Sequence, residues 1–210
     1  MAIKKLDLKT KFKSLYVPSA KTPVIVQVPN FLFVRIDGAI EKGFEPGNSP
    51  QFQQAMEALY GFAYTLKFAS KQRKKNPIDY PVMALEGLWW VEDGHFDITV
   101  KDNWFYTVQI MQPPHITPDM FDEARAKLKA KKENPALDRV RLESFEEGLC
   151  VQMMHIGPYA TEPATIEKMQ AFAQAQGYTF QHKHHEIYLG DPRRAQPEKL
   201  KTVLRHPVKK

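Results

Sequence analysis

Cysteine is nearly missing from this chain: Cys150 is the only one in 210 residues. A single thiol cannot form an intrachain disulfide, and it excludes a cysteine-rich metal site. Cys150 lies within the apolar run 149–154, where a buried and unreactive thiol is expected. Cysteine chemistry is therefore not a candidate for the function.

Long apolar stretches are missing as well. No run approaches the roughly 20 apolar residues of a membrane-spanning helix. The first 15 residues are charged, and they lack the apolar core of a secretory signal peptide. We therefore expect a cytoplasmic protein with no membrane partner.

Positive charge is in excess, with 30 basic residues against 24 acidic ones. Such an excess can attract nucleic acid by neutralising phosphates. Here the charge is diffuse, because the basic runs at 71–75 and 209–210 are short. No zinc-finger spacing, RNP-like motif or helix-turn-helix pattern accompanies them. We therefore expect a solvated surface and no nucleic-acid partner.

Motifs for cofactors and activated nucleophiles are also absent. The sequence has neither a phosphate-binding loop nor a nucleophile elbow. The histidine-rich segment 182–186 is the one place that suggests a metal. Zinc sites usually need three or four protein ligands, and no second cluster has a matching spacing. We therefore expect no metal and no cofactor.

The sequence does contain enough apolar material for a sizeable core. Hydrophobic residues make up 43% and charged residues 26%, which is ordinary for a globular domain. Three Trp, eight Tyr and thirteen Phe are present. Aromatic side chains bury large areas and also line ligand pockets, so their positions decide what they do.

The apolar pattern predicts two copies of a strand–helix–strand–strand unit. Ser49 and Pro50 begin the first helix as N-cap and first helical residue, and Glu162-Pro163 begin the second. We expect an α+β fold with pseudo-twofold symmetry around a central ligand cleft. It forms a single domain, 1–210, made of a lead-in 1–29, a first repeat 30–133 and a second repeat 140–208. Predicted strands are 24–28, 31–36, 82–91, 96–101 and 104–111, then 148–156, 182–189 and 199–208, with a further helix over 117–132.

Strand alternation selects the residues that face the cleft. Glu186 and Tyr188 share one face of the predicted strand 182–189. The apolar pair Ile187 and Leu189 lies on the other face, which we expect to meet the helix of the same unit. The repeat alignment places Glu86 on the equivalent face of the first unit. Two carboxylates and several aromatic rings are therefore expected to converge on one cavity.

A carboxylate in an apolar cavity supports two kinds of function. Burial there raises its pKa, so it can act as a general acid or base. It can equally attract a cationic aromatic ligand, which aromatic rings also favour. The structural alternative is that Glu186 or Glu86 simply pairs with Arg35, Arg193 or Arg194.

Further ligand-binding candidates are aromatic. Trp89 and Trp90 are consecutive in a predicted strand, so they point to opposite faces unless a bulge intervenes. One of them is therefore expected in the core, and the pattern does not decide which one contacts the ligand. Tyr106, in the closing strand of the first unit, is a further candidate.

Three segments together resemble the GyrI-like small-molecule-binding family, in particular its stand-alone branch. They are Leu85–Trp90, His155–Tyr159 and His185–Arg193. Segments of the lead-in resemble that branch too, so the resemblance covers nearly the whole chain. One departure is the stretch 39–48, where the family commonly has a shorter turn, and it puts the shape of the pocket entrance in doubt.

The resemblance implies the duplicated fold and two functions. Effector-binding domains of this kind bind hydrophobic, often cationic drugs around a central glutamate, and Glu186 is the matching position. Some stand-alone bacterial members hydrolyse cyclopropane-bearing DNA-alkylating toxins, a detoxification in which a glutamate and a tyrosine assist water attack. Glu186 and Tyr159 match those catalytic residues. Because one set of residues serves binding and hydrolysis, the sequence leaves both open.

Overall fold

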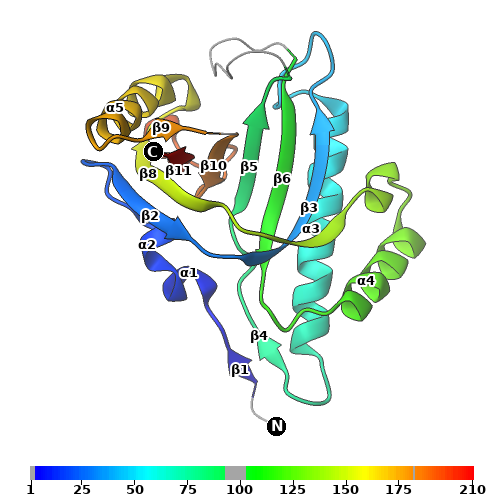
Figure 1. The fold of residues 1–210 in the computed structure, drawn as a ribbon. Coiled ribbons are helices and arrows are strands. Elements are labelled where there is room, and N and C mark those ends of the chain that lie inside the picture. The colour runs from blue at the N-terminus through cyan, green and yellow to red at the C-terminus, as the bar shows by residue number, and fades with distance from the viewer. Residues whose placement is uncertain (1–2, 93–102, 182) are drawn as a thin grey trace.

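A nine-stranded, largely antiparallel sheet dominates the molecule in this computed structural model, which describes residues 3–92, 103–181 and 183–210. The predicted strand 96–101 lies outside these residues. The strands follow the order β2 (Val24–Val28), β8 (Gly148–Ile156), β11 (Lys201–Lys209), β10 (His184–Tyr188), β5 (Leu85–Trp90), β6 (Phe105–Gln112), β3 (Phe31–Ala39) and β7 (Arg141–Phe145), while β9 (Thr179–Phe180) pairs with β11 (Figure 1).

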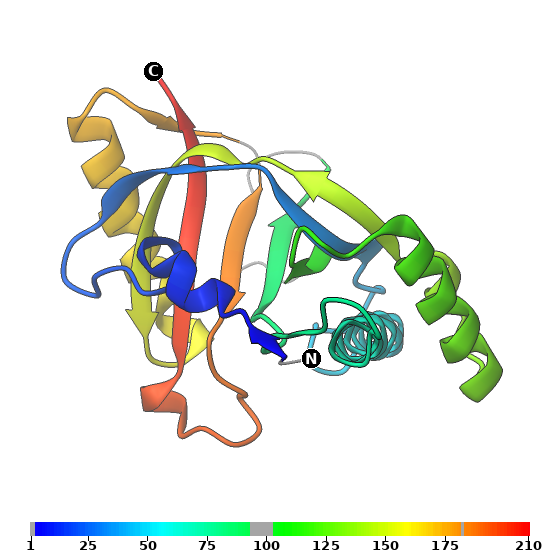
Figure 2. The same ribbon diagram turned by 90° about the horizontal axis from the view of Figure 1, so that it is seen from below.

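The two ends of this sheet are joined by one long antiparallel ribbon. β2 runs on into β3, and β7 runs on into β8. The register is continuous across both junctions, since Val28 lies opposite Gly148 and Phe31 lies opposite Phe145. The sheet therefore curls until its ends meet, as the view from below shows (Figure 2). In the described part of the chain, the strands with a single strand neighbour in the main strand order are the five-residue strands β2 and β7, so little strand edge stays open.

The strand order is the same from either side of the central pair β5–β10. Moving outward, β5 is followed by β6 and β3, and β10 is followed by β11 and β8. In this outward order, each set consists of the second, the closing and the first strand of one predicted repeat. This is the order that two repeated units would produce, and the division into repeats stays a prediction.

Two helices pack on the same face of the sheet, which we call the outer face. α3 (Pro50–Lys71) packs against β3 and β6, and α5 (Glu162–Ala175) packs against β8 and β11. The central strands β5 and β10 therefore lie between the two helices. α4 (Pro118–Lys131) packs against α3.

The predicted helix starts are confirmed. The Ser49 side chain accepts a hydrogen bond from the Phe52 amide at 3.0 Å, and Pro50 is the first residue of α3. Thr117 caps α4 in the same way. These caps satisfy amides that have no partner within a helix.

The N-terminal segment covers one end of the curled sheet. α1 (Leu8–Lys11) and α2 (Lys13–Tyr16) lie against the inner face of the sheet (Figure 2). The inner face is the one opposite α3 and α5. Short elements complete the chain: β1 (Lys4–Lys5), β4 (Ile78–Asp79), η1 (Pro135–Asp138), η2 (Tyr159–Thr161) and η3 (Pro197–Lys199).

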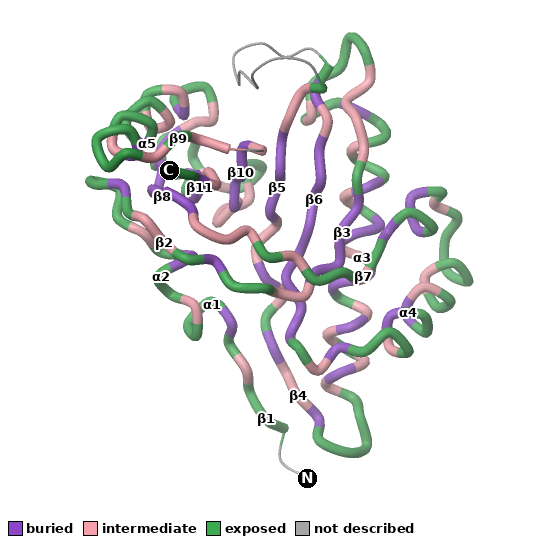
Figure 3. The backbone as a smooth tube through the Cα atoms, viewed as in Figure 1, coloured by how far each residue is buried: buried purple, intermediate pink, exposed green. Residues whose placement is uncertain are grey.

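Burial follows the central strands (Figure 3). A large core contains the apolar side of α3, and a smaller one joins α5 to β8 and β11. Cys150 is buried, as predicted, and burial raises the pKa of its thiol. None of the helices in the described parts of the chain combines the length and apolar character needed to cross a bilayer.

Candidate functional site

The two glutamates expected to share a cavity lie on opposite faces of the sheet. Glu186 is opposite Gly87 in the β10–β5 pairing, and Glu86 is opposite Ile187. Paired residues share a face and successive residues alternate, so Glu86 and Glu186 point in opposite directions. The prediction of two converging carboxylates is therefore wrong, because the register between β5 and β10 places Glu86 on the face of Ile187 and not on the face of Glu186.

The predicted position of Ile187 is also wrong. Leu204 lies opposite Glu186 in the β10–β11 pairing and packs with Met169 and Ala173 of α5. Glu186 is therefore on the outer face, and Ile187 is on the inner face. The cause is that α5 covers β8 and β11, which leaves the outer side of β10 free to carry polar residues.

Glu86 belongs to a fully buried polar cluster on the inner face. The Tyr16 hydroxyl donates to its Oε1 at 2.7 Å, and His185 Nε2 is 3.2 Å from its Oε2. His185 also contacts Glu147 through Nδ1 at 2.9 Å, and Arg205 contacts Glu147 at 3.1 Å. Two carboxylates therefore face two cations. We interpret this cluster as structural. Glu86 also lines a small cavity on the inner face together with Tyr16 and Phe33, so its contact with a ligand stays a prediction.

The charges of the inner cluster stabilise one another. Burial alone would lower the pKa of His185, but Glu147 and Glu86 outweigh burial and raise it to about 9. Burial alone would raise the pKa of Glu147, but His185 and Arg205 lower it to about 2. Removing one partner of such a buried pair typically costs about 3–5 kcal/mol.

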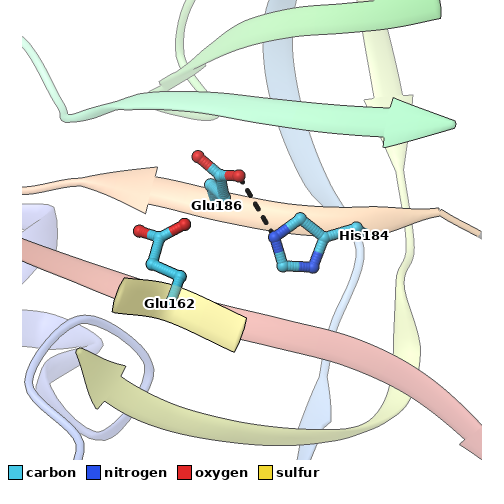
Figure 4. A group of neighbouring side chains, drawn as sticks. All are labelled: Glu162, His184 and Glu186. Atoms are coloured by element: carbon cyan, nitrogen blue, oxygen red, sulfur yellow. Dashed lines mark hydrogen bonds and ion pairs between the residues drawn. The ribbon is translucent and has the colours of Figure 1, made fainter. Parts of the chain in front are cut away.

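Glu186 is the centre of a second polar cluster, on the outer face. Its side chain is buried, with the residue 6% exposed. Glu162, the first residue of α5, points toward it and is 0% exposed (Figure 4). Among the described ion pairs, the three candidate arginines have other partners: Arg193 and Arg194 pair with Asp191, and Arg35 pairs with Glu143.

Two histidines hold Glu186 in place. His184 Nε2 lies 3.1 Å from Glu186 Oε1, and His184 Nδ1 lies 2.8 Å from His206 Nε2. We assign the protons so that His206 donates to His184 and His184 donates to Glu186. This leaves His206 Nδ1 bare, and that atom has no hydrogen-bond partner among the described residues. Burial and the two neighbouring histidines keep the pKa of His206 well below its usual value.

Two tyrosines border the carboxylate. The Tyr188 hydroxyl accepts a hydrogen bond from Trp89 Nε1 at 3.0 Å. Burial, together with the charge of Glu186 and a hydrogen bond to it, raises the pKa of Tyr188 well above its usual value. The ring of Tyr159 meets that of Tyr188 edge-on, with centroids 5.9 Å apart. Both tyrosines are partly exposed, so the cluster reaches the surface through them.

Glu162 is the unusual member of the outer cluster. Neither of its oxygens is in hydrogen-bonding geometry with a described residue. Burial and the charge of Glu186 raise its pKa to about 9, and the nearby Thr202 hydroxyl only partly opposes this. The N-terminus of α5 favours a negative charge by about 0.3–1 kcal/mol, whereas burying an ion costs several kcal/mol. We therefore assign Glu162 as a neutral acid at pH 7.

The aromatic candidates separate between the two faces. Trp89 and Tyr106 lie on the outer face, where both pack against Phe52 of α3. Tyr106 is fully buried, so it packs against Trp89 from within the core. Trp90 is on the inner face, where its ring stacks on Phe105. As predicted, the two tryptophans point in opposite directions, and Trp89 is the one near Glu186.

The outer cluster therefore brings together four of the predicted site residues and excludes two others. Glu186, Tyr159, Tyr188 and Trp89 meet there, while Glu86 and Trp90 lie on the inner face. Sequence reasoning missed Glu162 and the role of His184. The sequence identifies Glu162 only as a helix start, and the available signal is that this start closely follows the predicted site residue Tyr159.

One group of described residues could hold a metal ion. Glu162, His184 and Glu186 each offer a ligand atom, and these atoms lie within 4.8 Å of one another. Coordination through His184 Nε2 would require that nitrogen to exchange its Glu186 contact for the ion. The expectation that the protein binds no metal stays a prediction.

Comparison with known proteins agrees with this architecture. An uncharacterized conserved protein from Listeria innocua is 38% identical with a TM-score of 0.87, and covers 97% of this chain and 100% of its own. A hydrolase from the same organism is 36% identical with a TM-score of 0.84 and the same coverage. A second hydrolase, encoded by lin2189, is 38% identical with a TM-score of 0.86, and covers 98% of this chain and 100% of its own.

More distant similarity concerns the fold alone. The EcmrR C-terminal domain is 11% identical, with a TM-score of 0.54, and covers 90% of this chain and 98% of its own. No curated protein sequence matches the chain. The family model of the GyrI-like small molecule binding domain matches residues 23–209. The chain therefore belongs to the GyrI-like small molecule binding domain family.

Proposed function

We propose that this protein hydrolyses a hydrophobic, electrophilic small molecule that binds against Tyr159 and Tyr188. The observation that carries the proposal is the setting of Glu186. Its carboxylate is buried, yet His184 orients it and the partly exposed residues Tyr159 and Tyr188 border it. A positioned carboxylate in such a setting can take a proton from an attacking water.

Tyr159 is the proposed donor to the oxygen that becomes negative during the reaction. Burial and the charges of Glu186 and Glu162 raise its pKa to about 12. The hydroxyl therefore keeps its proton at neutral pH and can donate a hydrogen bond. Donors aimed at a developing oxyanion stabilise the transition state more than the ground state.

The relatives support hydrolysis. Two proteins that are 36% and 38% identical to this chain are hydrolases, and the similarity covers 100% of each of them. The resemblance to the stand-alone GyrI-like branch suggests cyclopropane-bearing electrophiles as the substrate class. Ring strain and a conjugated carbonyl make such a compound react with water without a metal.

The experiment is turnover of a spirocyclopropyl cyclohexadienone in ¹⁸O-labelled water. We expect a ring-opened phenol that carries one labelled hydroxyl. Glu186→Gln should lower kcat/KM by about 10²-fold or more, since general bases contribute about 10²–10⁴-fold. Tyr159→Phe should lower it by about 10-fold or more through loss of a donor.

The matched control is Glu167→Gln, a change on the exposed side of the same helix α5. This variant should keep the wild-type rate. Wild-type protein that produces no labelled phenol would contradict the proposed hydrolysis. So would full activity in Glu186→Gln.

A second function, binding without turnover, is favoured by the family assignment itself. The same carboxylate and rings would attract a hydrophobic cation. Tetraphenylphosphonium is a suitable probe, and isothermal titration calorimetry measures its affinity. Weaker binding by Glu186→Gln, together with no hydrolysis by wild type, would favour this second function.

A further inference from the structure

We propose that Glu162 stores a proton beside Glu186 and delivers it to the substrate as the second catalytic residue of the site. This inference rests on the proposed hydrolysis. It starts from geometry: Glu162 enters from α5 and Glu186 from β10, and both are buried. Glu162 points toward Glu186 (Figure 4), and an oxygen of each lies within 4.8 Å of one of the other.

Glu162 needs a positive partner, because neither of its oxygens has a hydrogen bond from a described residue. A proton or a cation could supply it. Both nitrogens of His184 are already engaged, by Glu186 and by His206, so a cation with His184 as a ligand would have to displace one of these contacts. A proton needs no rearrangement. The unequal surroundings of the two carboxylates then make one an acid and the other a base.

Several elements around Glu162 contribute titratable or polar groups. β8 packs against α5 and contributes His155, whose ring contacts Thr165 and Thr161. Burial lowers the pKa of His155 by more than Glu186 raises it.

β10 contributes Glu186 and Tyr188, and η2 contributes Tyr159. β11 contributes Thr202, which carries no charge. A ring nitrogen of His184 lies within 4.8 Å of an oxygen of each carboxyl group, and His184 donates to Glu186 in our assignment. Burial and the charge of Glu186 together keep the proton on Glu162.

The reaction balances with these two residues alone. The water oxygen bonds to a cyclopropane carbon while Glu186 takes the water proton. The ring C–C bond breaks, and its electron pair makes the dienone aromatic and places negative charge on the former carbonyl oxygen. Glu162 then gives its proton to that oxygen, which becomes a phenol. Afterwards Glu186 is protonated and Glu162 is ionised, and transfer of one proton between neighbours restores the starting state.

The test measures how strongly the rate depends on the acidity of the phenol product. A series of spirocyclopropyl cyclohexadienones with different ring substituents supplies this range. In the wild type the dependence should be shallow, because Glu162 protonates the leaving oxygen. In Glu162→Gln it should be steep, with kcat/KM about 10²-fold lower for the least acidic phenol and close to wild type for the most acidic.

Two further readouts separate proton delivery from a structural role. The wild-type rate should fall at alkaline pH as Glu162 ionises. This alkaline decrease in the pH–rate profile should be absent from Glu162→Gln. Difference infrared spectroscopy at pH 7 should show a protonated carboxyl band in the wild type and in Glu167→Gln. The band should be absent from Glu162→Gln.

The outcomes are distinguishable. Turnover with the same dependence on phenol acidity in wild type and Glu162→Gln would overturn this inference alone. Loss of wild-type activity in EDTA, with metal recovered from the protein, would also overturn it, since the cluster would then hold a cation. No turnover by wild type would contradict the proposed hydrolysis and, with it, the delivery step.

Discussion

His184 and His185 are neighbours in β10, yet they belong to different clusters. His184 contacts Glu186 on the outer face, and His185 contacts Glu86 and Glu147 on the inner face. Strand alternation is the cause. On the inner face, opposite charges meet within hydrogen-bonding distance. On the outer face, two carboxyl groups share one buried space, an arrangement typical of functional sites.

At the scale of single residues, Glu162→Gln should change how stability depends on pH. The pKa of Glu162 is raised from 4.5 to about 9 in the folded state. A raised folded pKa means that the folded state loses stability as pH increases between these two values. Glutamine does not titrate. Relative to wild type, the free energy of unfolding of the variant should therefore rise by a few kcal/mol from pH 5 to pH 9.

Urea denaturation at several pH values measures this difference, with Glu167→Gln as the control. Burying an amide in place of a carboxyl adds an offset that is the same at every pH, so the slope is the informative quantity. A difference between Glu162→Gln and wild type that stays constant with pH would show that Glu162 titrates normally.

At the scale of elements, Gly87 determines how the rings of the site sit on β5. A Cβ atom at Gly87 would lie 2.7 Å from Trp89 Nε1 and 3.1 Å from the Tyr188 hydroxyl. Both distances are shorter than ordinary contacts. Because Gly87 has no side chain, Trp89 and Tyr188 can form their hydrogen bond close to the backbone of β5. Gly87 is also the residue that pairs with Glu186.

Gly87→Ala should displace these rings. Overpacking of a well-packed site typically costs about 1–3 kcal/mol, and turnover should fall because Tyr188 moves from Glu186. Gly47→Ala is the matched control, since a Cβ at Gly47 meets nothing within 4 Å. Thermal melts and dienone hydrolysis measure both effects. Equal behaviour of the two variants would contradict the role assigned to Gly87.

Most elements could be predicted because their signals are local. The N-cap Ser49 with Pro50, and the turn at Gly157-Pro158, place α3 and the end of β8 closely. β7 could not be predicted, because its short polar sequence becomes a strand only by pairing with β3. That pairing spans more than 100 residues and is set by the closure of the sheet.

Part of the site could be predicted because its signal is also local. Glu186 and Tyr188 share a face by local alternation, and that prediction is confirmed. The position of Glu86 depends on the register between β5 and β10, and a shift of one residue reverses the face. Glu162 joins the site only through the packing of α5. Neither register nor helix packing can be read from one strand pattern.

At the scale of the whole molecule, the closed sheet separates two polar clusters by one layer of strands. The N-terminal helices seal the inner one, where the Gln152 amide and Arg205 donate to the Ser14 and Leu15 carbonyls. Inner-face residues should therefore affect stability, and outer-face residues should affect chemistry.

Tyr16→Phe tests this separation. The change removes the 2.7 Å hydrogen bond to Glu86 and leaves a buried carboxylate oxygen without its donor. We expect a loss of about 1–3 kcal/mol in the free energy of unfolding. The rate of dienone hydrolysis by the folded protein should not change. A large loss of kcat/KM at full folding would show that the inner cluster takes part in the reaction.

The most direct measurement is a crystal structure of Glu186→Gln grown with a spirocyclopropyl cyclohexadienone, which the variant should bind without opening. We predict the ligand on the outer face, against the rings of Tyr159 and Tyr188, with its cyclopropane beside position 186 and its carbonyl oxygen toward Glu162. A ligand bound on the inner face beside Glu86, or one that leaves Tyr159 and Tyr188 uncovered, would contradict the proposed site.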